Sequence, residues 1–111
     1  MSKNKAKGTT AETAVVNWLR TTLNNPHIER RALQGNRDTG DITGLPGIVI
    51  EVKNHAKHDL PGWLAELQTE VDNAKATLGL LVIKKRGTTN PGKWYWLIDP
   101  RHIPTILKDQ P

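Results

Sequence analysis

The chain of 111 residues contains no cysteine. This absence excludes disulfide scaffolds, cysteine-bearing zinc sites, iron–sulfur clusters and thiol nucleophiles. No apolar run approaches the roughly 20 residues that a membrane-spanning helix needs. The basic residues 1–7 lead into no apolar stretch of the kind that a secretory signal contains. We therefore expect a protein without a membrane partner.

Acidic residues are scarcer than basic ones: 11 Asp and Glu against 16 Lys and Arg give a formal net charge of +5. A small basic domain suggests an anionic partner, most often nucleic acid. The length is sufficient for one domain with one modest core. We predict a single domain over residues 9–111, preceded by a flexible basic arm at 1–8. The lysines of this arm either solubilise the chain or contact phosphates: Lys3, Lys5 and Lys7.

Hydrophobic periodicity predicts two main helices. An apolar stripe of helical period predicts a helix over 10–23, with Thr9 and Glu12 at the spacing of a capping box. A second stripe predicts a helix over 60–78, with Asp59 as its N-cap and Gly79 as its C-cap. A final short segment through Leu107 has room for one helical turn.

Apolar and β-branched runs between turn residues predict strands at about 27–33, 41–43, 48–53, 80–83 and 94–98. The strands at 48–53 and 80–83 should be parallel because a helix joins them, whereas 41–43 and 48–53 should be antiparallel across a tight turn. The element order is therefore α-β-β-β-α-β-β. It predicts an α/β fold with a small mixed β-sheet of about five strands flanked by helices.

One pattern in the sequence carries chemistry: Asp41, nine further residues, then Glu51-Val52-Lys53. Alternate side chains of a strand share a face, so Glu51 and Lys53 should project together. A loop of odd length at 45–47 would set Asp41 opposite Glu51 on the neighbouring strand. Two close carboxylates suit Mg²⁺ or Mn²⁺, and a lysine beside them can orient or deprotonate a water. The alternative is a surface ion pair between Glu51 and Lys53.

With these residues in this order of elements, the stretch from about Gly8 to Ile98 resembles the PD-(D/E)XK nuclease superfamily. Within it, the sequence is most similar to archaeal-type Holliday junction resolvases and their phage relatives. The family opens with a helix carrying a glutamate shortly after a glycine, here Glu12 after Gly8. Its acidic strand residue matches Asp41, and its paired motif matches Glu51-Val52-Lys53. Gly40 stands where the name of the superfamily places proline.

The resemblance implies a restriction-endonuclease-like core and a metal-dependent endonuclease that leaves a 5′-phosphate. It implies a metal held by Asp41, Glu51 and the Val52 carbonyl, with Glu12 binding a second metal or its waters. It also implies that Lys53 assists the nucleophilic water. A glutamine of the next helix lies near the site in many members and matches Gln68, which is otherwise an ordinary helix former. The loop serine of the archaeal-type resolvases has only Thr39 as its counterpart.

Basic residues flank this motif in two clusters, which either form solvated faces or bind phosphates. His55 follows Lys53 and is either a solvated loop histidine or a phosphate contact. The candidate DNA contacts of this part of the chain are Arg30, Arg31, Arg37, Thr39, His55, Lys84, Lys85 and Arg86.

We therefore predict an endonuclease that uses Mg²⁺ or Mn²⁺, acts on four-way or other branched DNA, and works in the cytoplasm of a prokaryotic cell or of a phage's host. Paired symmetric nicks at a junction imply a twofold homodimer. Two alternatives remain open: another nuclease role on this fold, such as nicking, repair or restriction-like cleavage, and a catalytically silent DNA-binding module.

Overall fold

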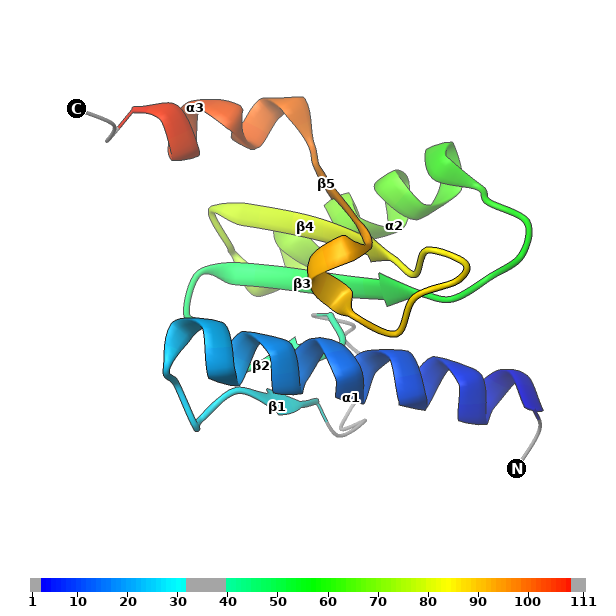
Figure 1. Cartoon of the computed structure of the whole chain (residues 1–111). Coiled ribbons are helices and arrows are strands. Elements are labelled where there is room, and N and C mark those ends of the chain that lie inside the picture. Colours follow the sequence, from blue (N-terminus) through cyan, green and yellow to red (C-terminus); the bar gives the residue numbers. More distant parts are fainter. Residues whose placement is uncertain (1–2, 32–39, 109–111) are drawn as a thin grey trace.

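The computed structural model describes residues 3–31 and 40–108. In these residues five strands form two sheets, and three α-helices pack around them (Figure 1). The first half contains α1 (Lys3–Leu23), β1 (Glu29–Arg30), β2 (Ile42–Thr43) and β3 (Ile48–Lys53). The second half contains α2 (Leu60–Ala74), β4 (Leu78–Ile83), β5 (Tyr95–Ile98) and α3 (Ile103–Leu107). Two short 3-10 helices, η1 (Pro91–Lys93) and η2 (Pro100–His102), flank β5.

The larger sheet has the order β3-β4-β5. Strands β3 and β4 are parallel and are joined through α2, as the sequence predicted. Strand β5 is antiparallel to β4. The smaller sheet pairs β1 with β2 in antiparallel register. The single five-stranded sheet expected from the sequence is therefore divided in two. The two-residue strand β2 forms its ladder with β1, and the backbone hydrogen bond to β3 comes from Asp41, the residue before β2.

The chain between β2 and β3 makes a tight turn at Pro46 and Gly47. The Ile48 N–H donates to the Leu45 carbonyl at 3.1 Å, and Gly47 has φ +77°. Proline followed by a glycine of positive φ is typical of a type II turn. The odd-length loop that would set Asp41 opposite Glu51 in a ladder is therefore replaced by this turn, and Asp41 instead lies along the edge of β3.

Helix α1 begins at Lys3, so residues 3–8, expected to be a flexible arm, belong to its first turns. The expected capping box is absent because Thr9 and Glu12 lie inside the helix. The Thr10 hydroxyl donates to the Ala6 carbonyl at 2.9 Å, which is an intrahelical bond. Asn54 Nδ2 also donates to the Lys7 carbonyl at 3.4 Å and links this end of the helix to the loop after β3.

Helix α2 begins as predicted and ends earlier. Asp59 is the N-cap, and its carboxylate accepts from the Gly62 N–H at 3.1 Å. The helix ends at Ala74, and Lys75 adopts a left-handed conformation at φ +53°. The apolar stripe extends to Leu78, but the chain has already turned there. The Leu78 N–H donates to the Gly47 carbonyl at 3.2 Å, and the residue starts β4 beside β3.

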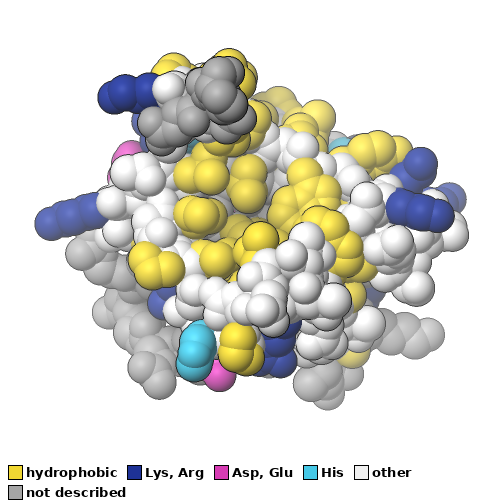
Figure 2. Space-filling model, turned by 60° about the vertical axis from the view of Figure 1, so that its left-hand side comes forward, with side chains coloured by type: hydrophobic (Ala, Val, Ile, Leu, Met, Phe, Trp, Pro, Cys, Tyr) yellow, Lys and Arg dark blue, Asp and Glu magenta, His cyan; other side chains and the backbone are white. Residues whose placement is uncertain are grey.

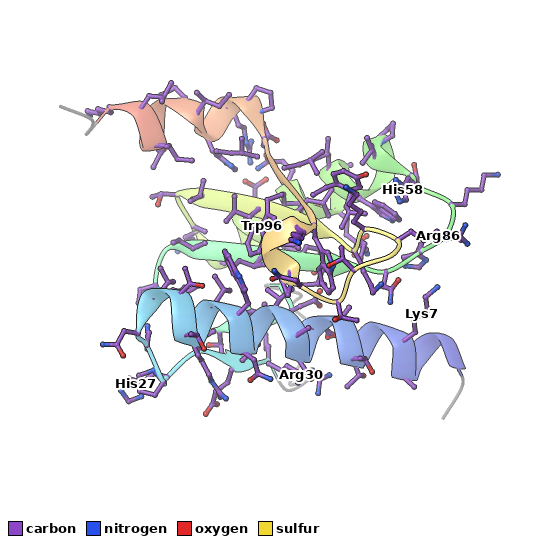
Figure 3. The ribbon with its side chains drawn as sticks, in the orientation of Figure 1. Lys7, His27, Arg30, His58, Arg86 and Trp96 are labelled. Atoms are coloured by element: carbon purple, nitrogen blue, oxygen red, sulfur yellow. The ribbon has the colours of Figure 1, made fainter. Side chains whose placement is uncertain are left out.

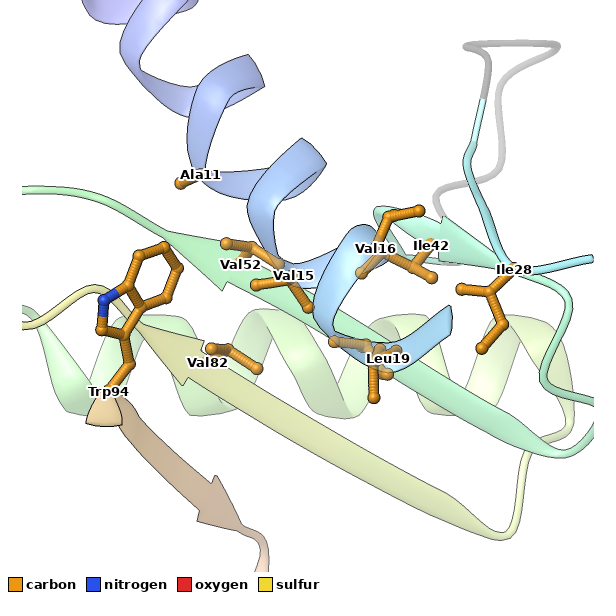
Figure 4. Packing of buried hydrophobic residues seen from close by; sticks show 10 residues of the cluster. Ala11, Val15, Val16, Leu19, Ile28, Ile42, Val52, Val82 and Trp94 are labelled. Carbon is orange, nitrogen blue, oxygen red and sulfur yellow. The ribbon is translucent and has the colours of Figure 1, made fainter. Parts of the chain in front are cut away.

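Two cores cover the two faces of the larger sheet. Buried residues of α1 pack with Ile50, Val52 and Val82 on one face (Figure 4). Buried residues of α2 pack with alternating residues of the same strands on the other face, including Val49 and Leu81. This alternation of strand residues places Glu51 and Lys53 on the α2 side. None of the helices formed by residues 3–31 and 40–108 is long and apolar enough to cross a membrane.

Candidate metal centre

The site is built around the second half of β3. Glu51 lies near the C-terminal end of β3, an edge strand of the larger sheet, on the face that α2 covers, and is only 4% exposed. Its Oε2 lies 3.3 Å from the Nζ of Lys53, which is on the same face of the strand. The other oxygen, Oε1, is buried and has no hydrogen-bond partner among the described residues. A buried carboxylate oxygen in this state is suited to an electropositive ligand, because its desolvation is otherwise uncompensated.

Asp41 reaches the same segment from the edge of β3. Its N–H donates to the Ile50 carbonyl at 3.0 Å, and its Oδ2 accepts from the Val52 N–H at 2.8 Å. The N–H and C=O of one strand residue point to the same edge, so the Val52 carbonyl lies on the edge that faces Asp41. The structure therefore places Asp41 and the Val52 carbonyl on one edge of β3, where the charge of Asp41 also acts on Glu51.

Gly40 permits this close approach. It has φ +100°, and a Cβ at this position would lie 2.8 Å from Val49 Cγ1 and 3.2 Å from the Ile50 carbonyl oxygen. Any side chain here would therefore displace the backbone that carries Asp41 from β3. Glycine at this position, where the superfamily that the sequence resembles has proline, therefore has a local structural reason.

Glu12 lies on α1 within electrostatic reach of Asp41. Burial raises the pKa of Glu12, the charge of Asp41 raises it further, and Arg30 opposes both. The Arg30 guanidinium lies 3.6 Å from Glu12 Oε2. Both residues therefore have a contact that the sequence did not predict. Glu12 is ion-paired within the site region, and Arg30 is engaged with it while remaining partly exposed.

Neighbouring carboxylates raise the pKa of Glu51. Burial is the main cause for Glu51, and the charges of Asp41 and Glu70 add to it, so that its pKa rises to about 11. Burial lowers the pKa of Lys53, but the charges of Glu51 and Glu66 outweigh it and hold that pKa above its ordinary value. The site thus contains more carboxylates than the single ammonium of Lys53 can compensate. Such a concentration of negative charge is suited to a divalent cation, which can take the place of a proton.

Sequence reasoning missed two glutamates of α2, Glu66 and Glu70. Each contributes an oxygen to a cluster with Glu51 in which the three ligand atoms lie within 4.8 Å of one another. Both oxygens of Glu66 lie 3.2 Å from Lys53 Nζ. One signal was available in the sequence: Glu66 and Glu70 are four residues apart beside the apolar stripe, which places both side chains on the same side of the helix.

Gln68 does not join this group. It lies two positions from Glu66 and from Glu70, about 200° around the helix. Its Nε2 donates to Asp72 Oδ1 at 3.3 Å. The expectation that Gln68 approaches the motif is therefore corrected, and the α2 residues that face Glu51 are the two glutamates.

The predicted DNA contacts fall in different places. Lys7, His55 and the 84–86 cluster line one cavity at the end of β3 and β4. Arg31 lines a separate depression near the turn before β3. Helix α1 includes Lys3 and Lys5 in its first turn, although their side chains lie outside the described part of the chain. Arg37 and Thr39 also lie outside the described residues.

Comparison with known proteins gives no match: no protein-family model, no curated protein and no solved structure is similar to this chain.

Proposed function

We propose that the protein is a metal-dependent endonuclease of the PD-(D/E)XK type that hydrolyses phosphodiester bonds in DNA. The observation that carries this proposal is the hydrogen bond of 2.8 Å from the Val52 N–H to Asp41 Oδ2. It joins residues eleven positions apart and places an aspartate against the middle of Glu51-Val52-Lys53. A surface ion pair between Glu51 and Lys53 explains neither this bond nor the burial of Glu51.

The donors of the site fit Mg²⁺ or Mn²⁺. They are carboxylate and carbonyl oxygens, the hard ligands that these ions take. Asp41, Glu51 and the Val52 carbonyl would hold the ion. The buried Glu51 Oε1, which has no hydrogen-bond partner among the described residues, would be one of its oxygen ligands. When bound, such an ion supplies Lewis-acid polarisation of the phosphate and a more acidic water.

Lys53 has the role of a positioned cation. Its raised pKa keeps the ammonium protonated at neutral pH, so it serves to orient the water and to compensate negative charge on the phosphate. Of the two functions open to this lysine, orientation is favoured over deprotonation of the water. Attack of the water oxygen on phosphorus and departure of the 3′ oxygen, which takes a proton, would leave a 5′-phosphate and a 3′-hydroxyl.

For the substrate we propose a four-way junction or other branched DNA, cut by a homodimer. A junction is resolved by two symmetric nicks, and a C2 dimer presents two identical sites in the required symmetry. Nicking, repair or restriction-like cleavage of other DNA is the alternative on the same site.

Cleavage assays with purified protein and Mg²⁺ or Mn²⁺ test the proposal on a four-way junction, a linear duplex and a single strand. Asp41→Asn, Glu51→Gln and Lys53→Ala should each abolish cleavage and leave binding largely intact. Gln68→Ala is the matched control, because this residue lies on the same helix as Glu66 but faces Asp72, and it should cut normally.

The outcomes separate the alternatives. Paired nicks in the junction support a resolvase, and equal cutting of linear duplex supports another nuclease role. A fully active Lys53→Ala protein would remove the proposed mechanism. Retained, salt-sensitive DNA binding without any cleavage would identify a catalytically silent DNA-binding module.

A further inference from the structure

A basic cavity lies next to the candidate metal centre. Its volume is about 650 Å³, within the roughly 300–1,000 Å³ that small-molecule and cofactor sites occupy. Figure 3 shows Lys7, His58 and Arg86 on the same side of the molecule, each from a different segment of the chain. The residues that line the cavity are Lys7, Asn54, His55, Ala56, His58, Lys84, Lys85, Arg86 and Tyr95.

The wall of this cavity continues directly from the strand that bears the metal ligands. Asn54 and His55 follow Lys53 in sequence, and the Lys84 N–H donates to the Lys53 carbonyl at 2.9 Å. The rings of His55 and His58 lie 5.4 and 5.7 Å from the ring of Trp63, a buried residue of α2. The cavity therefore adjoins the candidate metal centre through the end of β3 and through α2.

The charge of the cavity is of one sign. Three lysines and one arginine line it, and no aspartate or glutamate does. Lys7, Lys84, Lys85 and Arg86 form no ion pair with a carboxylate of the described residues. Cations gathered in this way repel one another, so an anionic ligand that spans them is favoured.

An aromatic ring completes the wall. Tyr95, at the start of the edge strand β5, is 48% exposed. The Nζ of Lys85 lies 5.9 Å from the centre of its ring. Cations that follow a backbone, combined with an exposed aromatic ring on which a base can stack, are the features of sites for single-stranded nucleic acid. A continuous duplex offers phosphates to such a site but keeps its bases stacked inside the helix.

We propose that this cavity binds an unpaired single-stranded segment of the DNA substrate adjacent to the scissile phosphate, with its phosphates on Lys84, Lys85 and Arg86 and a base on Tyr95. This inference rests on the proposed function, since it assigns the part of the substrate that leaves the metal centre. Branched or flapped DNA offers such an unpaired segment and a continuous duplex does not, so this inference favours branched or flapped DNA as the substrate class.

Fluorescence anisotropy in EDTA tests binding apart from cleavage. The probes are a short oligo-dT strand, a blunt duplex, and the same duplex with an unpaired flap. We expect the wild-type protein to prefer the flapped probe over the blunt one. Tyr95→Ala should weaken binding of the strand and the flap about tenfold, while binding of blunt duplex is unchanged, and Tyr95→Phe should behave as wild type.

The lysine and arginine variants test the phosphate contacts. Lys85→Gln and Arg86→Gln should each weaken strand binding and lower its salt slope by about 0.7 for each lost contact. Lys93→Gln is the matched control, because Lys93 is an exposed lysine outside the cavity, and it should leave both quantities unchanged.

Two results distinguish failure of this inference from failure of the proposed function. Equal affinity for flapped and blunt DNA in a protein that cuts DNA overturns the inference and leaves the function standing. A preference for the flap that depends on Tyr95, in a protein that cuts no DNA with Mg²⁺ or Mn²⁺, overturns the function and supports the binding of unpaired DNA at this cavity. An effect of Lys93→Gln as large as that of Lys85→Gln would also overturn the inference.

Discussion

Glu51 combines two properties that oppose each other: its side chain is ionisable, and it is buried. Its carboxyl is almost fully buried, and one oxygen contacts Lys53 while the other has no hydrogen-bond partner among the described residues. Burial of such a group costs free energy unless its charge is removed or compensated. Without metal, the neutral form is favoured because the pKa is raised to about 11. The residue that suits the metal therefore also destabilises the metal-free protein.

This conflict predicts how stability depends on pH in EDTA. The pKa of Glu51 is higher in the folded chain than its ordinary value of 4.5 in the unfolded chain. Between these two values the folded state holds a proton that the unfolded state has released, so the free energy of unfolding should fall as pH rises. The slope is at most about 1.4 kcal/mol per pH unit for one such group. Urea unfolding at several pH values from mildly acidic to mildly alkaline measures it.

Glu51→Gln should flatten this dependence, because the amide has no proton to exchange, and should raise stability at neutral pH. Glu29→Gln is the matched control, since Glu29 is an exposed carboxylate on β1, and it should preserve the wild-type slope. Mg²⁺ should stabilise the wild type and not Glu51→Gln. A wild-type slope that Glu51→Gln leaves unchanged would contradict the assignment of the proton to this residue.

The sequence was informative about some site residues and not about others. Glu51 and Lys53 could be assigned to one face because strand alternation depends on neighbouring residues alone. The approach of Asp41 could be proposed, but not its geometry, because it depends on Gly40 and on a turn that replaces the expected hairpin ladder. Glu66 and Glu70 belong to no short motif, and their contribution depends on how α2 is rotated over β3.

The N-terminal end of α1 gives a prediction at the scale of the element. Gly8 lies inside the helix, and a Cβ at this position would have no heavy atom within 4 Å. Gly8→Ala should therefore stabilise the protein by about 0.5–1 kcal/mol, the helix-propensity difference between these residues. Thermal or urea unfolding measures the change. An unchanged stability would indicate that residues 3–8 are the flexible arm that the sequence alone suggested.

The packing of α2 on β4 gives a second prediction of this kind. A Cβ on Gly79 would lie 2.7 Å from Val71 Cγ2 and 3.2 Å from Leu67 Cγ. Gly79→Ala should therefore destabilise the protein by about 1–3 kcal/mol through overpacking, in the opposite direction to Gly8→Ala. Urea unfolding of the two variants side by side provides the comparison. A neutral Gly79→Ala would mean that α2 lies farther from the sheet.

Elements with strong local signals were predicted well. Strand β3 occupies the residues expected from its β-branched run, and α2 begins after its Asp59 cap. The C-terminal end of α2 was wrong because Leu78 continues the helical spacing while its backbone pairs beside β3. The division into two sheets was also unpredictable, since it depends on which neighbour the two-residue β2 pairs with.

Charge is separated across the whole molecule. The five carboxylates of Glu12, Asp41, Glu51, Glu66 and Glu70 and the ammonium of Lys53 give a formal local charge of −4, so the rest of the chain carries a formal +9. The net +5 is therefore an average of an acidic centre and a more basic surface that includes the cavity beside it. This distribution favours the approach of an anionic polymer to the basic surface and the approach of a cation to the acidic centre.

The proposed homodimer requires a surface away from this charge. Exposed apolar residues gather on α3, where Ile103 is 38%, Ile106 41% and Leu107 61% exposed. Figure 1 shows α3 on the side of the molecule opposite to the loops after β3 and β4, which line the basic cavity. Hydrophobic side chains occupy the centre of the face shown in Figure 2, with Lys and Arg toward its rim. An apolar patch with a charged rim fits a second copy of this chain.

Leu107→Glu should therefore convert a dimer into a monomer, because a C2 axis places the introduced carboxylates of both copies in one interface. Size-exclusion chromatography with light scattering measures the mass, and unfolding measurements confirm that the variant is folded. Leu60→Glu, on an exposed residue at the start of α2, is the matched control and should stay dimeric. On a four-way junction, Leu107→Glu should yield single nicks in place of paired ones. A wild-type monomer that still makes paired nicks would contradict this surface and the dimer together.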